Sequence, residues 1–347
     1  MSLRRRMGPA PRLQPMPSAR PVHAGRLAGW ERLAFALVFA LMMAFVVVIT
    51  ISSARAHGQG GAGGSAGSPS SAARPRPRPA ARPRAGAGAG SGSGSGGQTA
   101  GRAARAAWDH RLAVALAPVV QGRPGSLAVG VIDSSTGAAA VYGRRLRFQA
   151  ASIVKPEILA ALLLRARHAP AGLSNSDAGL AAQMIEASDR VAANRLWDLA
   201  GRAGGLAAAD VILGLRHTTP GPGEKWGLTT TTVGDQLTLL TDLTTAKSPL
   251  SSAERAYELS LMRTVGPAQP WGVSAAAGPG GVSAIKNGWR LDGPARLWVV
   301  NSIGVVRRDG QRLLMAVLSR GQPTRAAGIA AADAAAVAAA DCMTSGG

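Results

Sequence analysis

The stretch Gln149-Ala150-Ala151-Ser152-Ile153-Val154-Lys155 places a serine three positions before a lysine. It opens a segment, Ser152–Arg167, that is apolar on most sides and therefore predicts a buried helix. Residues three apart share one face of a helix, so the Ser152 hydroxyl and the Lys155 amine can come within hydrogen-bond distance. A neutral lysine can take the proton of a serine hydroxyl and make it a nucleophile. The stretch thus predicts a nucleophilic serine with a lysine base.

Lysine is rare in the chain, since only four of the 39 basic residues are lysines. An arginine guanidinium stays protonated in proteins, whereas a lysine amine loses its proton when it is desolvated or placed near another cation. Two of the four lysines, Lys155 and Lys286, lie in short polar motifs. Lysine at these positions indicates a role in proton transfer rather than a contribution to the overall charge.

Two further motifs follow in order along the chain. The first is Ser188-Asp189-Arg190, with Asn194 on the next helical turn. The second is Lys286-Asn287-Gly288-Trp289, at the start of the last group of predicted strands. The complete order is S-x-x-K, then S-D-x, then K-x-G, and this order is more specific than any four-residue pattern alone.

The pattern of the remaining segments predicts an α+β domain. Alternating and β-branched stretches predict five strands: Ser126–Asp133, Ala138–Tyr142, Gly281–Trp289, Ala295–Ser302 and Arg312–Leu318. Further helices are predicted at Ala178–Ala187, Val191–Ala200, Val233–Leu243 (capped by Thr229–Thr232) and Thr324–Asp341. Two strands, a helical middle, three strands and a last helix are typical of one antiparallel sheet with helices packed on it.

With these motifs in this order, the chain resembles the penicillin-recognising serine hydrolases, which include class A β-lactamases and D-Ala-D-Ala peptidases. The resemblance covers roughly residues 120–342 and includes the hairpin sequence AVGVIDSSTG at 128–137. It implies a β-lactamase/transpeptidase-like fold, with a five-stranded antiparallel sheet flanked by helices and a reduced all-helical lobe.

The resemblance also implies roles for individual residues. Ser152 is the expected acylated nucleophile, Lys155 its proton partner, and Ser188 the relay of a proton to the leaving nitrogen. Backbone N–H groups of Ser152 and Trp289 are expected to form the oxyanion hole. Lys286 supplies positive charge for a substrate carboxylate, and Gly288 allows a substrate to approach the backbone of an edge strand. The expected substrate-binding set is Arg190, Asn194, Lys286, Asn287, Gly288 and Trp289.

The chain departs from the family pattern in three places. Arg190 stands where the family usually has asparagine, and Asn287 stands where it has threonine or serine. The loop before Thr229 lacks the E-x-x-L-N sequence that supplies the deacylating glutamate in class A β-lactamases. Its one glutamate, Glu224, is either that base or a solvated loop carboxylate paired with Lys225. Without a positioned base, slow deacylation is expected.

The composition excludes several other kinds of site. With a single cysteine, Cys342, the chain can form no intramolecular disulfide and no Cys/His metal cluster. Its histidines lie in no recognisable catalytic context, and no G-x-S-x-G sequence is present. We expect a mechanism that needs no metal and no cofactor.

The N-terminal third predicts a membrane anchor and a tether. Residues 1–32 form a basic cytoplasmic tail, and residues 33–52 contain nineteen uncharged residues, Leu33–Ile51, which is about the ~20 needed to cross a bilayer. The arginine-rich flank predicts a cytoplasmic N-terminus and an extracytoplasmic domain. A cleaved signal peptide ending near Ala56 is the alternative. Residues 53–103 predict a disordered Gly/Ser/Pro/Arg linker, and residues 104–347 the hydrolase domain.

The formal net charge of +21 belongs mostly to the tail and the linker. Nucleic-acid binding is not expected, because no basic face with aromatic residues and no known module is visible. The alternatives for the linker are contact with an anionic wall or membrane surface and a coding bias towards arginine. The sequence carries no signal for the oligomeric state.

We therefore predict a membrane-anchored, extracytoplasmic serine hydrolase that acts through a Ser152 acyl-enzyme. The expected partner is a cell-wall peptide or a related amide or ester, with a β-lactam-like small molecule less favoured. A catalytically degenerate cell-wall-binding or sensing module is the second hypothesis, because the second and third motifs are altered. A true β-lactamase that uses Glu224 is the third.

Overall fold

The computed structural model describes residues 94–167, 172–265, 269–279, 281 and 284–344. All of them belong to one compact unit, which spans Ala87–Gly347. The predicted tail, membrane segment and most of the linker lie outside the described residues, so the predictions for them stay predictions.

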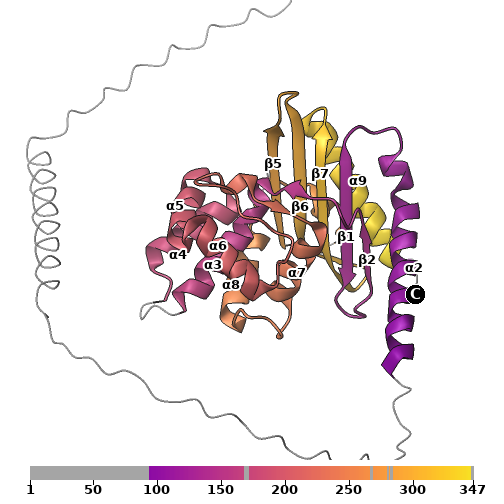
Figure 1. The fold of residues 1–347 in the computed structure, drawn as a ribbon, viewed down its shortest axis with the longest axis horizontal. Coiled ribbons are helices and arrows are strands. Elements are labelled where there is room, and N and C mark those ends of the chain that lie inside the picture. The colour runs from indigo at the N-terminus through magenta and orange to yellow at the C-terminus, as the bar shows by residue number, and fades with distance from the viewer. Residues whose placement is uncertain (1–93, 168–171, 266–268, 280, 282–283, 345–347) are drawn as a thin grey trace, which may run out of the picture. The chain divides into compact units, whose positions relative to one another are not determined.

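A five-stranded antiparallel sheet with strand order β2-β1-β7-β6-β5 forms the centre of the domain (Figure 1). Its strands are β1 (Ser126–Asp133), β2 (Ala139–Tyr142), β5 (Ala284–Asp292), β6 (Leu297–Arg308) and β7 (Gln311–Gln322). The predicted sheet is confirmed, and the predicted strands overlap the observed ones. Strand β6 is longer than predicted because it continues to Arg308, into a charged hairpin end that breaks the apolar pattern, and strand β7 is longer mainly because it continues past Leu318 to Gln322.

Helices α2 (Gly94–Val120) and α9 (Arg325–Thr344) pack together against one face of the sheet (Figure 1). Helix α7 (Val233–Thr244) packs against the other face at β1 and β7. The remaining helices form a helical lobe beside the sheet. They are α3 (Val154–Ala166), α4 (Asn175–Glu186), α5 (Arg190–Ala200), α6 (Arg202–Leu213) and α8 (Ser252–Arg263).

The two faces of the sheet bury separate apolar cores, as the alternation of strand β1 requires. Val129 and Val131 face the core beneath α2 and α9, whereas Ala128 faces the core shared with the helical lobe. Gly130 lies on the same face as Ala128, where a Cβ would come 2.6 Å from Leu237 of α7. The glycine therefore lets α7 pack closely on the sheet.

Helix α9 is the one helix of the described residues that is long and apolar enough to cross a membrane by length and composition. Five of its alanines are fully buried: Ala332, Ala335, Ala336, Ala339 and Ala340. A Cβ on its Gly328 would come 2.5 Å from Val300 of β6. Small residues thus let α9 lie close on the sheet, as in the core helix of a globular domain.

Three helices are missing from the sequence prediction. Helix α2 begins at Gly94, within the segment 53–103 predicted as linker, and buries Leu112 and Leu116. Helix α6 contains Gly204 and Gly205, residues with low helix propensity that hide its apolar face. Helix α8 begins with a capping box between Ser251 and Glu254, a signal that the S-x-x-E spacing carries.

Candidate active site

Ser152 lies in η1, a short 3-10 turn (Ala151–Ile153) that runs directly into α3. The α-helix thus begins two residues later than predicted. Ala151, just before the serine, has φ +50°, a strained value for a residue with a side chain. Asn301 of β6 donates to the carbonyls of Gln149 (2.8 Å) and Ala150 (3.1 Å) and so ties the segment before the serine to the sheet. The sequence analysis missed this buried amide.

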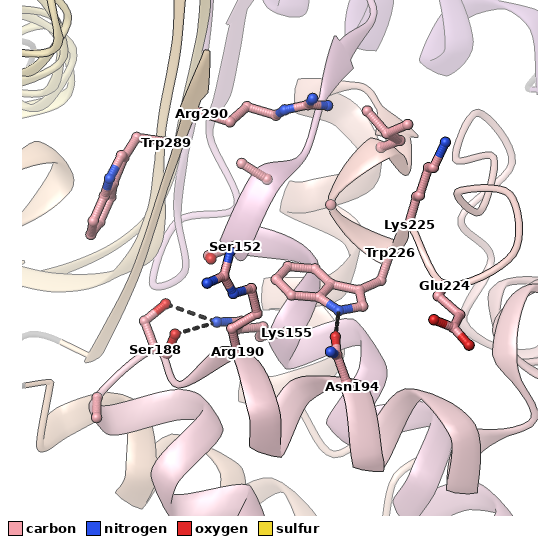
Figure 2. Close-up of a pocket in the computed structure, with 14 residues that line it drawn as sticks. Ser152, Lys155, Ser188, Arg190, Asn194, Glu224, Lys225, Trp226, Trp289 and Arg290 are labelled. Atoms are coloured by element: carbon pink, nitrogen blue, oxygen red, sulfur yellow. Dashed lines mark hydrogen bonds between the residues drawn. The ribbon is translucent and has the colours of Figure 1, made fainter. Parts of the chain in front are cut away.

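A cavity of about 690 Å³ lies beside the turn that carries Ser152 (Figure 2). Its lining comes from η1, α3, the start of α5, the end of β5 and the loop before α7. The predicted site residues that line it are Ser152, Lys155, Ser188, Arg190, Asn194, Glu224 and Trp289. Residues from four separate parts of the sequence therefore meet around one space.

Lys155 is buried and points towards the residue that begins the second motif. Its side chain is 1% exposed. Its Nζ donates to the Ser188 hydroxyl at 3.0 Å, to the Ser188 carbonyl at 2.5 Å and to the Asp189 carbonyl at 3.2 Å (Figure 2). Within the described residues, no hydrogen bond joins Lys155 to the Ser152 hydroxyl. The amine is held by the second motif at the edge of the cavity into which Ser152 opens.

Lys286 reaches the same serine from the sheet. Its side chain is fully buried, and its Nζ donates to the Ser188 hydroxyl at 3.1 Å and to the Asn287 carbonyl at 3.1 Å. Lys286 does not line the cavity itself. Its hydrogen bond to Ser188 connects it to a residue that does line the cavity.

Burial lowers the pKa of both lysines, and a neighbouring cation adds to the shift of each. Desolvation lowers the pKa of Lys155 to about 8; the charge of Asp189 opposes the shift and that of Arg190 adds to it. Desolvation and the charge of Lys155 hold the pKa of Lys286 well below its ordinary value. Near neutral pH Lys155 can therefore exist as the neutral amine far more often than an exposed lysine does.

Ser188 is fixed at the junction between two helices. It has φ +55°, and the next residue, Asp189, caps α5 by accepting a hydrogen bond from Ala192 N at 2.7 Å. The cap and the strained backbone together turn the Ser188 hydroxyl towards the two lysines. Backbone strain of this kind is concentrated at functional sites.

The structure gives Gly288 a packing role, and the predicted approach of a substrate to its backbone stays a prediction. A Cβ at this position would lie 2.7 Å from Ser152 N and 2.8 Å from Ile153 N. The glycine therefore lets β5 pack directly against the turn that carries the serine, whereas the prediction had it make room for substrate. Gly288 does not line the cavity.

Asn287 likewise does not reach the cavity. It is fully buried, and its Nδ2 donates to the carbonyls of Gln269 (3.0 Å) and Trp271 (3.2 Å). Its Oδ1 accepts from the Ser302 hydroxyl at 2.6 Å. The expectation of a substrate contact is corrected: the amide joins β5 to its neighbours because it points to the opposite side of the strand from Lys286.

Trp289 and Arg290 form the wall of the cavity on the β5 side (Figure 2). The Trp289 ring lies against Trp271, with 5.9 Å between ring centroids, and Arg325 stacks over it at 4.0 Å. Arg290 donates to Gln149 Oε1 at 2.5 Å. This wall is thus fixed by contacts behind it.

The opposite wall comes from the Trp226 loop, which we define as residues 214–229. Trp226 donates through Nε1 to Asn194 Oδ1 at 2.7 Å, and its ring lies 5.0 Å from Lys155 Nζ (Figure 2). Trp197 of α5 donates to the Gly223 carbonyl at 2.9 Å and fastens the same loop. The sequence analysis missed Trp226, although a lone aromatic residue in a Gly/Pro-rich loop is a usable signal. Asn194 binds the loop, so its amide oxygen is already occupied.

Glu224 lies at the rim of the cavity and points to solvent. Its side chain is 78% exposed and forms an ion pair with Arg202 at 3.6 Å. The loop carboxylate is thus solvated, as the alternative interpretation held, but its partner is Arg202 and not Lys225. In Figure 2 the Trp226 ring lies between Glu224 and Lys155.

A metal site is not apparent in the part of the chain that the structure describes, because no group of three or more His, Cys, Asp or Glu side chains gathers there. Cys342 is buried in α9, away from the cavity-lining residues. The described side chains that line the cavity supply hydroxyls, amines, two guanidinium groups, an amide and a carboxylate.

Comparison with solved structures identifies the fold. A class A β-lactamase from Bacteroides cellulosilyticus is similar with a TM-score of 0.60 and 16% identity, over 69% of this chain and 99% of that one. A β-lactamase from Xanthomonas campestris gives 0.59 and 22%, over 68% and 98%. A class A β-lactamase from Mycobacterium abscessus gives 0.58 and 21%, over 68% and 99%.

No protein-family model and no curated protein sequence matches the chain. The likeness is therefore one of structure, and it extends over nearly the whole length of each neighbour. The described domain has the fold of these β-lactamase structures.

Proposed function

We propose that the domain is a serine hydrolase of the β-lactamase and penicillin-binding type, which forms an acyl-enzyme at Ser152. One observation carries the proposal: the Ser188 hydroxyl accepts hydrogen bonds from two buried lysines, Lys155 and Lys286, beside the cavity that Ser152 lines. A structural role alone gives no reason to bury two amines around one hydroxyl, since each burial costs several kcal/mol.

The proposed acylation uses these groups in sequence. Neutral Lys155 takes the proton of the Ser152 hydroxyl as the oxygen attacks the substrate carbonyl carbon. The tetrahedral oxyanion accepts hydrogen bonds from the backbone N–H groups of Ser152 and Trp289. The proton passes from Lys155 through the Ser188 hydroxyl to the leaving nitrogen or oxygen, and the C–N or C–O bond breaks. Lys286 supports the relay by donating to Ser188.

The altered second and third motifs do not favour the degenerate binding module. Asn287 serves packing and leaves the Lys155–Ser188–Lys286 arrangement intact. Arg190 adds a cation to the cavity without displacing Lys155. We therefore favour a catalytic domain over a module that only binds a ligand.

The proposed substrate is a cell-wall peptide or a related amide or ester. Turnover of β-lactams is the weaker candidate, because Glu224 is solvent-exposed and paired with Arg202. For the whole chain we propose a single-pass membrane protein anchored by residues 33–52, with the domain outside the cytoplasm. This rests on the uncharged Leu33–Ile51 stretch and its arginine-rich flank.

Covalent labelling tests the proposal. The purified protein is incubated with a fluorescent penicillin and, separately, with a 4-nitrophenyl ester, and the adduct is located by peptide mass spectrometry. We expect the acyl group on Ser152, loss of labelling in Ser152→Ala, and full labelling in Ser260→Ala, an exposed serine on α8. Equal, weak labelling of wild type and Ser152→Ala would reject the acyl-enzyme hypothesis and favour the binding-module hypothesis.

A further inference from the structure

Arg190 is an unpaired cation inside the cavity. It is the first residue of α5, and its side chain is exposed to the space that Ser152 lines (Figure 2). Other arginines of the domain, such as Arg167 and Arg202, form ion pairs with nearby acids. Among the described residues Arg190 has no ion pair and no hydrogen-bond partner. Its guanidinium is available to a ligand.

The cavity around Arg190 carries an excess of positive charge. Lys155, Lys225 and Arg290 also line it, and Glu224, the one carboxylate among its described lining residues, is exposed and paired with Arg202. The Arg190 charge is felt at the catalytic amine, since it helps to lower the pKa of Lys155. An anion at Arg190 relieves this repulsion, so the free enzyme favours a negatively charged ligand there.

The position of Arg190 indicates which part of a substrate it meets. Arg190 and Asn194 lie one turn apart on the same face of α5, and Asn194 is bonded to Trp226. Ser188, which protonates the leaving group in the proposed mechanism, lies just before Arg190 at the start of α5, on the side away from Asn194 (Figure 2). The leaving group therefore sits towards Ser188, and the acyl portion extends over Arg190 towards the Trp226 loop.

We infer that Arg190 is the specificity-determining residue of the acyl subsite, and that the enzyme takes amides or esters whose acyl portion carries a carboxylate. The planar guanidinium offers two parallel N–H donors that match a carboxylate. The Trp226 ring provides an apolar wall for the methylene groups between that carboxylate and the scissile carbonyl. A peptide with an acidic residue on the acyl side has this chemistry. The inference rests on the proposed acylation of Ser152.

A matched pair of esters tests the inference. The probes are mono-(4-nitrophenyl) adipate and its methyl ester, which share one leaving group and differ only in whether the distal carboxylate is free. The measured quantity is the ratio of kcat/KM for the anionic ester to that for the neutral ester at pH 7.5. This ratio cancels any change in the pKa of Lys155 or in the folded fraction, because both esters experience it equally.

We expect wild type to prefer the anionic ester by roughly 10-fold to 100-fold, the worth of one charge-assisted hydrogen-bonded pair. Arg190→Gln should bring the ratio to about 1, whereas Arg190→Lys should keep part of the preference because it keeps the charge. Arg195→Gln removes the same charge from an exposed position on the same helix and should leave the ratio unchanged. An unchanged ratio in Arg190→Gln, or equal rates for both esters in wild type, overturns the inference.

A binding measurement separates this inference from the proposed function. Monomethyl adipate is titrated calorimetrically into Ser152→Ala and into the same variant carrying Arg190→Gln. Binding that Arg190→Gln removes, together with no ester turnover by wild type, leaves the anion subsite standing and rejects the acyl-enzyme. Turnover through Ser152 with no preference between the esters rejects the anion subsite and leaves the acyl-enzyme standing.

Discussion

Lys155 and Lys286 converge on a single acceptor, the Ser188 hydroxyl, at 3.0 and 3.1 Å. One amine comes from the helix that follows Ser152 and the other from strand β5, and both are nearly inaccessible to solvent. Two buried cations at one oxygen repel each other, so at least one is easily deprotonated. In the proposed mechanism this arrangement serves as the base and the proton relay.

The pH dependence of acylation should follow Lys155. Its neutral form is the base, so the acylation rate should rise about tenfold per pH unit below an inflexion near pH 8, set by the pKa of about 8, and level off above it. Stopped-flow measurement of the 4-nitrophenolate burst between pH 6 and 9.5 gives this profile. Arg190→Gln should move the inflexion to higher pH, because it removes one of the charges that lower the pKa.

A Lys155→Arg variant checks the assignment of this profile. A guanidinium does not deprotonate in this range, so acylation should fall by roughly 100-fold to 10,000-fold, the usual worth of general-base catalysis. Retention of the wild-type profile in this variant would show that the inflexion belongs to another group.

Gly288→Ala should slow acylation strongly while leaving the domain folded. The added Cβ would lie 2.7 Å from Ser152 N, so β5 and the turn that carries the serine must separate. We expect the burst rate to fall by roughly 100-fold and the free energy of unfolding by about 1 to 3 kcal/mol, as for other overpacked sites. Burst kinetics and denaturant unfolding measure the two effects.

Gly179→Ala is the matched control for this variant. Gly179 lies within α4, and a Cβ there would meet nothing within 4 Å. This change should leave the burst unchanged and stabilise the domain by about 0.5 to 1 kcal/mol, because alanine favours the helix. A Gly288→Ala burst equal to that of this control would contradict the proposed role of the close contact.

Glu224→Gln should leave deacylation within about twofold of wild type. The carboxylate is 78% exposed and paired with Arg202, and such surface pairs contribute little. Intact-protein mass spectrometry of the acyl-enzyme over time gives the deacylation rate. Accumulation of acyl-enzyme in this variant alone would restore Glu224 as the base and favour a β-lactamase.

Stability should fall as pH rises through neutrality because of the buried pair Glu157 and Asp210. Burial and the charge of Asp210 raise the pKa of Glu157 well above its usual range, and burial raises the pKa of Asp210 to about 7. Above about pH 4 the unfolded state has released these protons, whereas the folded state still binds them. The free energy of unfolding therefore falls as pH rises through about 7. The melting temperature should be higher at pH 5.5 than at pH 8.

Glu157→Gln should weaken this dependence. A neutral amide cannot ionise and can donate to Asp210, so the variant should gain roughly 1 to 3 kcal/mol at pH 8, the cost of an unsatisfied buried polar group. Thermal unfolding at the two pH values measures the gain, and Glu224→Gln, which changes an exposed carboxylate, should show none. A Glu157→Gln variant that loses stability at pH 8 would rule out this account of the pair.

Local sequence patterns predicted most of the sheet but fewer of the helices. Strand β1 was predicted at its observed bounds, because its alternating apolar residues face two separate cores. Helix α6 was missed because Gly204 and Gly205 lower its helix propensity; Gly205 is required there because a Cβ would lie 1.8 Å from the Ala200 carbonyl oxygen. Tertiary packing overrode propensity at that point.

The order of the motifs, the positions of Ser152, Lys155, Ser188 and Lys286, and the fold class follow from sequence alone, because the period and spacing of residues are properties of neighbouring positions. The contacts that each side chain makes do not follow from sequence alone. Asn287 and Lys286 are adjacent in sequence, yet one serves packing and the other meets Ser188. The packing of β5 and α5 against the start of α3 decided this, because contacts between distant segments depend on how those segments are placed in space. The same packing leaves Arg190 in the cavity without an ion-pair partner among the described residues.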